Sequence, residues 1–330
     1  MATVGSTYMT LADVYRQSEN TKQIATIIEM LAEMNPIIED ARVEECNDGT
    51  KHLTTTRTGL PAVTWRRLYE GVQPSKSTTK QVVDSTGMLE AWSEVDAKLV
   101  AISPDPKKLR LNEAHSFMEA MNNEMATGIF YHNTQIDPEK FLGLSPRFSD
   151  LTAENSSQIV DAGGTGSDNT SIWFVVWGER TVHLLYPRGS QAGLQREDKG
   201  VQTKTNSDGS LYDVYREKYT WDVGLSIRDW RYVSCVRNID TAVASFTGGT
   251  LDLEGYMIDA YYALRQRRVA GGQAVIYCNS TVKKYLHKRA RDKSNVNLTL
   301  SDYQGVEILK FLGIPIKECD AVLNTEARVT

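Results

Sequence analysis

The 330-residue sequence has little cysteine and no long apolar run. Without a run of 18 or more apolar residues it offers no transmembrane helix, and its first residues lack both the basic start and the apolar core of a secretory signal. No two cysteines have the C-x-x-C spacing of a zinc or redox site. We therefore predict buried, unpaired thiols in a reducing compartment at Cys46, Cys235, Cys278 and Cys319.

No half of the chain carries a strong excess of basic residues. Residues 1–150 have 15 Lys and Arg against 21 Asp and Glu, and residues 151–330 have 22 against 21. A general nucleic-acid-binding protein would have a basic surface, so this balance argues against that class. With 41% hydrophobic and 24% charged residues, the composition is typical of a folded chain of about two domains.

Motifs of the common catalytic classes are also missing. The glycine-rich residues 163–169 lack the lysine and the following helix of a phosphate-binding loop, so an ordinary loop is the preferred interpretation. The five histidines lie on different predicted elements and match no hydrolase, metalloprotease or zinc pattern. We predict no catalytic, cofactor-binding or metal-binding residue. One alternative stays open, a cytosolic α+β enzyme whose site converges on folding from residues such as His183 and Asp222.

Helical periodicity is found in the first part of the chain. It predicts helices from Leu11 and over 24–34, which Asn35-Pro36 ends because the residue before a proline avoids helical geometry. It also predicts an amphipathic helix over 88–102 and a longer one over 107–131. The last would be about 36 Å long, more than a compact domain usually needs, and its methionines are core-packing residues.

Residues 41–80 have an unusual composition. Eight of the 31 residues from Thr50 to Lys80 are threonine, and few are apolar. The pattern predicts two strands, 52–58 and 62–69, around a turn at Gly59-Leu60-Pro61. A two-stranded hairpin without a core is marginal in water unless something covers it. Two interpretations remain open, a mobile surface loop and a long hairpin that packs on another subunit.

The rest of the chain predicts a β-rich region followed by alternating helices and strands. Strands are expected over 158–240, with a turn at 206–209, and after Thr241 helices over 251–265 and 280–291 alternate with strands over 274–278 and 308–316. A basic cluster falls on and just after the helix at 280–291, which is either a solvated face or a surface that meets an anion or an acidic partner. It consists of Lys283, Lys284, Lys288, Arg289 and Arg291.

The order of several short motifs resembles the major capsid proteins of short-tailed bacteriophages (podoviruses), which have the Hong Kong 97 type of fold. No motif is diagnostic by itself, but their order covers essentially the whole chain. They are Asn35-Pro36-Ile37-Ile38-Glu39-Asp40, Thr58-Gly59-Leu60-Pro61, Trp65-Arg66-Arg67-Leu68, Gly71-Val72, Trp177-Gly178, Tyr186-Pro187-Arg188-Gly189-Ser190, Gly193-Leu194, Asp229-Trp230-Arg231-Tyr232, Asn238-Ile239-Asp240, Phe311-Leu312-Gly313-Ile314-Pro315-Ile316 and Ala321-Val322-Leu323.

The resemblance implies an α+β capsid fold with four parts. These are an N-terminal arm (1–40), an extended loop that lies over the adjacent subunit (41–80), a peripheral domain (81–240) with a spine helix over 107–131, and an axial domain (241–330). It further implies a structural protein, not an enzyme, that assembles into pentamers and hexamers of an icosahedral head around double-stranded DNA. A bacterial nanocompartment shell of the encapsulin type is the alternative function for the same fold.

The resemblance also implies partners. They are other copies of the chain, the portal, a decoration or cement protein, and packaged double-stranded DNA through non-specific contacts, with assembly in the host bacterial cytoplasm and no membrane. A separate scaffolding protein is expected because only about forty residues precede the loop. Some relatives join subunits by Lys–Asn isopeptide bonds whose formation a carboxylate assists. No lysine, asparagine and carboxylate of this sequence can be matched to those three residues.

Four residues of the extended loop are the candidate inter-subunit contacts, because Trp, Tyr and Arg dominate binding hot spots. They are Trp65, Arg66, Arg67 and Tyr69. The alternative is that they cover the base of the loop in their own subunit.

Overall fold

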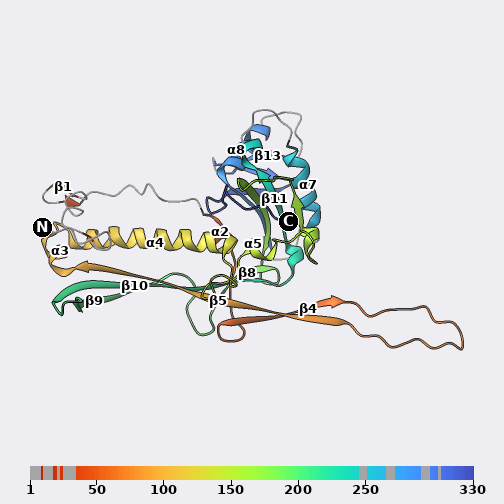
Figure 1. Ribbon diagram of the computed structural model, residues 1–330, viewed down its shortest axis with the longest axis horizontal. Coiled ribbons are helices and arrows are strands. Elements are labelled where there is room, and N and C mark those ends of the chain that lie inside the picture. Colours follow the sequence, from red (N-terminus) through yellow and green to blue (C-terminus); the bar gives the residue numbers. More distant parts are fainter. Residues whose placement is uncertain are drawn as a thin grey trace. The chain divides into compact units, whose positions relative to one another are not determined.

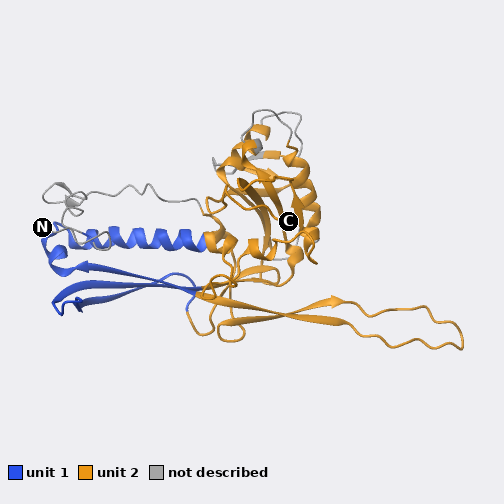
Figure 2. Ribbon diagram, in the orientation of Figure 1, with its two compact units in different colours: residues 1–33, 88–126, 191–222 blue, residues 34–87, 127–190, 223–330 orange. Residues whose placement is uncertain are grey.

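The structure, a computed structural model, describes residues 9, 18–20, 23–24, 35–244, 251–264, 272–290, 298–303 and 306–330 (Figure 1). The chain divides into two compact units, each built from segments far apart in sequence (Figure 2). Unit 1 comprises residues 1–33, 88–126 and 191–222, and unit 2 comprises residues 34–87, 127–190 and 223–330. The helices predicted between Leu11 and Met34 fall largely outside the described residues. Within them, Ser18–Asn20 (β1) and Gln23–Ile24 (β2) are short antiparallel strands.

In unit 1 a helix packs on strands. The helix predicted over 107–131 is α4 (Pro106–Tyr131), of which residues 106–126 belong to this unit. Strands β9 (Gln195–Thr205) and β10 (Leu211–Ile227, of which residues 211–222 belong to this unit) form an antiparallel hairpin, closed by the predicted turn at 206–209. On the helix, Phe117 stacks on Tyr219 of β10 with the ring centroids 5.5 Å apart. A second small core joins Val95 to α4 and α3 (Ala97–Ile102).

The amphipathic helix predicted over 88–102 is wrong for most of its length. Residues Thr78–Asp96 form one long strand, β5, and only 97–102 are helical. Leu89, Ala91, Ser93 and Val95 alternate on the more buried face of this strand, so the same apolar residues satisfy a period of two. The helical interpretation also needed Met88 and Trp92 in the core, and their exposed fractions are 78% and 46%.

Unit 2 is built around β7 (Asn169–Trp177), a strand buried along its whole length. Strands β11 (Val233–Asp240) and β12 (Gln273–Cys278) pair with it on either side, both antiparallel. Next to β12, the sheet continues through β15 (Ile314–Glu318), β14 (Val306–Phe311) and β13 (Leu298–Tyr303). The strand predicted over 308–316 is thus two strands, β14 and β15. Leu312 and Gly313 turn between them with positive φ.

Helices cover this sheet, as the alternating pattern after Thr241 predicts. Leu253–Ala263 (α7) and Ser280–Ala290 (α8) share an apolar core with β7, β11, β12, β14 and β15. Other elements of the unit are shorter. They are α2 (Ile37–Asp40), β3 (Val43–Glu45), α5 (Leu144–Arg147), a 3-10 turn at Ser156–Gln158, β6 (Ile159–Asp161), β8 (Val182–Tyr186), a 3-10 turn at Trp230–Tyr232, and α6 (Thr241–Ala244).

A buried polar network fixes the C-terminal segment to the centre of unit 2. Glu326 accepts hydrogen bonds from the hydroxyls of Tyr131 and Ser171, the latter at 2.7 Å. Arg237 Nη2 lies 3.5 Å from Glu326 Oε2, and the Arg237 guanidinium lies 5.1 Å from the centre of the Trp173 ring. Arg237 and Glu326 are only 3% and 6% exposed. An ion pair in such a place is sensitive to removal of either partner.

The hairpin of unit 2 pairs β4 (Lys51–Gly59) with the first residues of β5, from Ser85 opposite Lys51 to Thr78 opposite Gly59. The strand predicted over 62–69 is therefore wrong, since residues 60–77 have no helix or strand. Residues 78–85 compete better as the partner because they place Val83 opposite Leu53 and Val82 opposite Thr54. Cross-strand pairs that include a β-branched residue stabilise a ladder, and Pro61 would remove a donor from one.

Candidate inter-subunit surface

Residues 60–77, here called the tip, connect the two strands of the hairpin (Figure 1). The tip holds large apolar side chains on the surface, where a soluble monomer rarely gathers them. They are Leu60, Val63, Trp65, Leu68, Tyr69 and Val72, with Trp65 and Tyr69 fully exposed. Arg66 and Arg67 are exposed beside them. The four predicted contact residues thus lie together on the tip and do not cover the base of the hairpin in their own chain.

The backbone of the tip is held by a few local bonds. Glu70 N–H donates to the Arg67 carbonyl at 3.3 Å, and Ser75 Oγ donates to the Ala62 carbonyl at 2.8 Å. Tyr69, inside the first of these turns, has a φ of +66°. This left-handed region is unfavourable for a residue with a side chain, by roughly 1–2 kcal/mol. The tip therefore presents Tyr69 outward from a strained turn.

Buried polar contacts attach the base of the hairpin to the rest of unit 2. Arg147 Nη2 donates to Asp84 Oδ1 at 2.8 Å and to the Leu225 carbonyl at 3.1 Å. Thr56 Oγ1 donates to the Arg228 carbonyl at 2.9 Å. Because Asp84 is almost fully buried, its pairing with Arg147 holds β5 in one position. The base is thus rigidly placed, whereas the tip beyond it has only its own turns.

Two histidines also pack at the base. The rings of His52 and His183 meet edge to face with centroids 5.5 Å apart, and both residues are buried. Burial, together with the charge of Arg228 and the neighbouring His52, lowers the pKa of His183 to about 3. Burial and Arg228 also lower the pKa of His52. Both rings are therefore neutral at pH 7.

The low pKa of His183 predicts that unit 2 loses stability in acid. Below pH 6.5, the ordinary pKa, the unfolded chain binds a proton at His183 that the folded chain does not, until the pH reaches about 3. At pH 5 this difference amounts to about 2 kcal/mol. We expect urea unfolding of unassembled subunits to show that loss between pH 7.5 and 5, and a His183→Phe variant to lack it. An equal pH dependence in both chains would refute the prediction.

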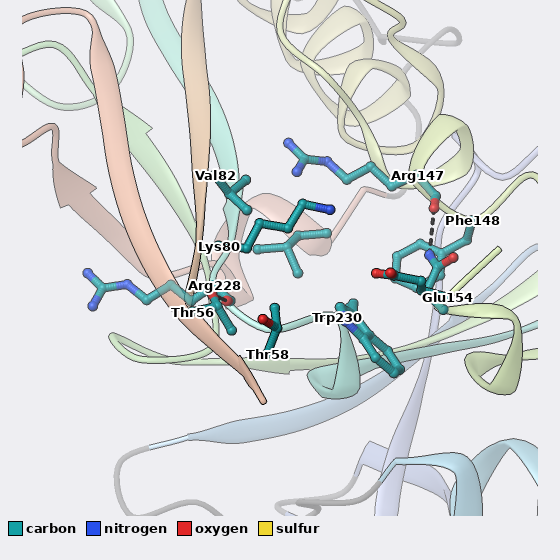
Figure 3. Close-up of a pocket in the computed structure, with 11 residues that line it drawn as sticks. Thr56, Thr58, Lys80, Val82, Arg147, Phe148, Glu154, Arg228 and Trp230 are labelled. Carbon is teal, nitrogen blue, oxygen red and sulfur yellow. Dashed lines mark hydrogen bonds between the residues drawn. The ribbon is translucent and has the colours of Figure 1, made fainter. Parts of the chain in front are cut away.

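A pocket of about 210 Å³ lies between the hairpin base and its neighbours in unit 2 (Figure 3). Apolar side chains form much of its lining, together with three basic residues and one acidic residue. Asn155 Nδ2 donates to the Arg147 carbonyl at 2.7 Å and fixes one wall. The complete lining is Thr56, Thr58, Lys80, Val82, Arg147, Phe148, Glu154, Asn155, Ile227, Arg228 and Trp230. No feature of the sequence indicated this pocket, because its residues come from four separate segments.

The structure places the basic cluster on α8, except Arg291, which lies outside the described residues. Lys283 pairs with Glu318 at 3.1 Å and Arg289 with Glu254 at 3.0 Å, and Lys288 also interacts within the chain. Lys284 and Lys288 are exposed. The positive charge available to a partner is therefore smaller than the sequence count indicates.

The alternative enzymatic site has little support in the structure. His183 and Asp222 belong to different units, and the charged neighbours that act on His183 are Arg228 and Arg42, besides His52. A carboxylate that could orient the ring as a base is not among them. Within the described ranges, no three His, Cys, Asp or Glu side chains gather as a metal site would need. None of the helices described is long and apolar enough to span a membrane.

The prediction of buried, unpaired thiols is confirmed for all four cysteines. Burial raises the pKa of Cys46 to about 11 and that of Cys235 and Cys278 to about 12. These three thiols are therefore protonated at neutral pH and poor nucleophiles, since the thiolate is the reactive form.

Comparison with known proteins gives one sequence family and several solved structures. The family described as major capsid protein GP7 matches residues 19–330. The structure of bacteriophage Epsilon15 includes a chain that is 38% identical, with a TM-score of 0.78, and the match covers 100% of this chain and 99% of that one. The capsid of bacteriophage JBD30 is 9% identical with a TM-score of 0.49, over 93% and 97% of the two chains. The SrpI encapsulin from Synechococcus elongatus is 10% identical with a TM-score of 0.46, over 69% and 95%. No curated protein matches.

Proposed function

The chain belongs to the major capsid protein GP7 family, and we propose that its copies join through the hairpin tip into the pentamers and hexamers of an icosahedral shell around double-stranded DNA. It is a bacteriophage head shell protein with the α+β Hong Kong 97 type of fold. The observation that carries the proposal is the tip, which exposes Trp65 and Tyr69 completely. Apolar surface of this kind is buried when copies associate.

Shell formation needs no single strong contact. A tip that binds a different surface on the next copy makes a head-to-tail interface, and repeated copies close into rings when the rotation allows it. Each subunit then takes part in several contacts at once, so that modest interfaces give a stable shell. In this proposal four parts of the chain build the shell. They are the arm (1–40), the extended loop (41–80), the peripheral domain (81–240, with α4 as its spine) and the axial domain (241–330).

The proposal includes partners beyond other copies of the chain. A separate scaffolding protein directs assembly in the host bacterial cytoplasm, and the portal and a decoration or cement protein bind the shell. Lys284, exposed on α8, supports weak contact with packaged DNA. Such contact is independent of sequence and weakens with salt. The protein acts as structure rather than as an enzyme and requires no cofactor.

Coexpression of the chain with its scaffolding protein tests the proposal. We expect sedimentation to show particles far larger than any small oligomer, and electron micrographs to show closed shells. A persistent small oligomer in the presence of the scaffolding protein would contradict shell formation. Enzyme cargo in place of DNA in particles from infected cells would favour the nanocompartment alternative.

A further inference from the structure

The pocket at the hairpin base has the size of one large side chain. At about 210 Å³ it is smaller than the roughly 300–1,000 Å³ that sites for drug-sized ligands and cofactors occupy. Its walls include Val82, Phe148, Ile227 and Trp230, which favour an apolar occupant. These dimensions match a single side chain from another protein surface.

Two lining residues of opposite charge, Lys80 and Glu154, favour an apolar occupant that also has a polar group. In Figure 3 the Lys80 amine and the Glu154 carboxylate point inward, whereas the guanidinium groups of Arg147 and Arg228 point away. Neither Lys80 nor Glu154 has an ion-pair partner among the residues that the structure describes. Both residues are exposed to solvent, and an indole complements both groups, because its N–H donates to a carboxylate and its ring face attracts an ammonium.

The tip supplies an indole with no partner of its own. Trp65 is fully exposed, whereas Trp173 and Trp177 are buried in the core and Trp92 is partly covered. Arg66 follows it directly, and Glu154 is the one carboxylate of a lining that also holds Lys80, Arg147 and Arg228. Since Trp65 is exposed, it does not occupy the pocket of its own chain.

We infer that Trp65 of one copy inserts into this pocket on the next copy, an inference that rests on the proposed shell-forming function. Tip and pocket are different surfaces of unit 2, so the contact is head-to-tail and continues from copy to copy until a ring closes. The apolar walls receive the ring, and Glu154 accepts the indole N–H. Tryptophan is among the residues enriched at interface hot spots, where it fills a pocket on the partner.

Two substitutions and two matched controls test the contact. Trp65→Ala removes the occupant, and Thr58→Trp fills the pocket from an exposed position on its rim. The controls are Val63→Ala on the tip and Thr55→Trp, an exposed residue of the same strand that does not line the pocket. The measurement is the subunit concentration at which half of the chains sediment as shells.

We expect Trp65→Ala and Thr58→Trp each to raise that concentration at least about 30-fold, and each control to change it less than about threefold. The double variant should raise that concentration about as much as the more severe single variant does, because the two substitutions remove the same contact. Normal assembly of either single variant, or multiplied effects in the double variant, overturns the contact and leaves shell formation standing. Absence of shells from the unmodified chain overturns both.

Cross-linking gives a second readout that does not depend on assembly strength. In shells formed at high concentration, Trp65→Cys with Glu154→Cys should yield covalent multimers with a short bismaleimide. Trp65→Cys alone should stay monomeric on a denaturing gel, because the four native cysteines are buried. Monomer only from the double-cysteine shells overturns the contact.

Discussion

A chain in which residues 60–77 are replaced by Asn-Gly is expected to fold normally and to form no shells. The replacement suits the hairpin because Gly59 and Thr78 are already paired across it. Asn-Gly forms the two-residue turn whose twist matches antiparallel strands. No contact of the base is touched, since Arg147, Asp84 and Thr56 lie outside the deleted segment. Every exposed apolar side chain of the tip is lost, so the expected result is soluble subunits that do not assemble.

Sedimentation in the presence of the scaffolding protein measures this outcome, and circular dichroism verifies folding. The double substitution Arg66→Glu and Arg67→Glu, which keeps the full tip, should weaken assembly less than the replacement of the tip does. Lys76→Glu is the matched control, a single reversal of an exposed tip residue outside the predicted contacts. Shells of normal yield from the shortened chain would show that the tip is not an assembly contact.

The sequence predicts secondary structure well where the spacing of apolar residues fits only a helix or only a strand. It predicts secondary structure poorly where the same residues fit both. In residues 107–131 the apolar residues have helical spacing and do not alternate with polar ones. The observed helix α4 agrees with the predicted bounds within one residue. Residues 88–96 satisfy both periods, because Leu89, Ala91 and Val95 are two residues or a multiple of two apart. The choice between them depends on strands far away in the sequence, and no local window contains those strands.

The candidate contact surface was predictable only in part. The tip residues could be found because a threonine-rich hairpin with Trp65 and Tyr69 cannot bury them in a core of its own. The pocket could not be found, since Lys80, Glu154 and Trp230 come together only through tertiary packing. The pairing of Lys283 with Glu318 was hidden for the same reason. Composition thus identifies surfaces that need a partner better than it identifies the surfaces that receive one.

The second large effect concerns the buried pair of Glu326 and Arg237. Glu326→Gln is expected to lower the free energy of unfolding of unit 2 by about 3–5 kcal/mol, because it leaves the Arg237 guanidinium buried without a counter-charge. The hydrogen bonds from Tyr131 and Ser171 to this side chain can persist on the amide oxygen. The loss therefore reports the charge rather than the hydrogen bonds.

Urea unfolding of unassembled subunits checks this expectation. Glu318→Gln is the control, because it breaks the partly exposed pair with Lys283 in the same unit and should cost only about 0–1 kcal/mol. Combining Glu326→Gln with Arg237→Met removes both charges, and the double variant should recover part of the loss because no uncompensated charge remains. If the double variant instead loses the sum of the two single effects, the two groups are not coupled. In that case Glu326 stabilises the C-terminal segment only through Tyr131 and Ser171.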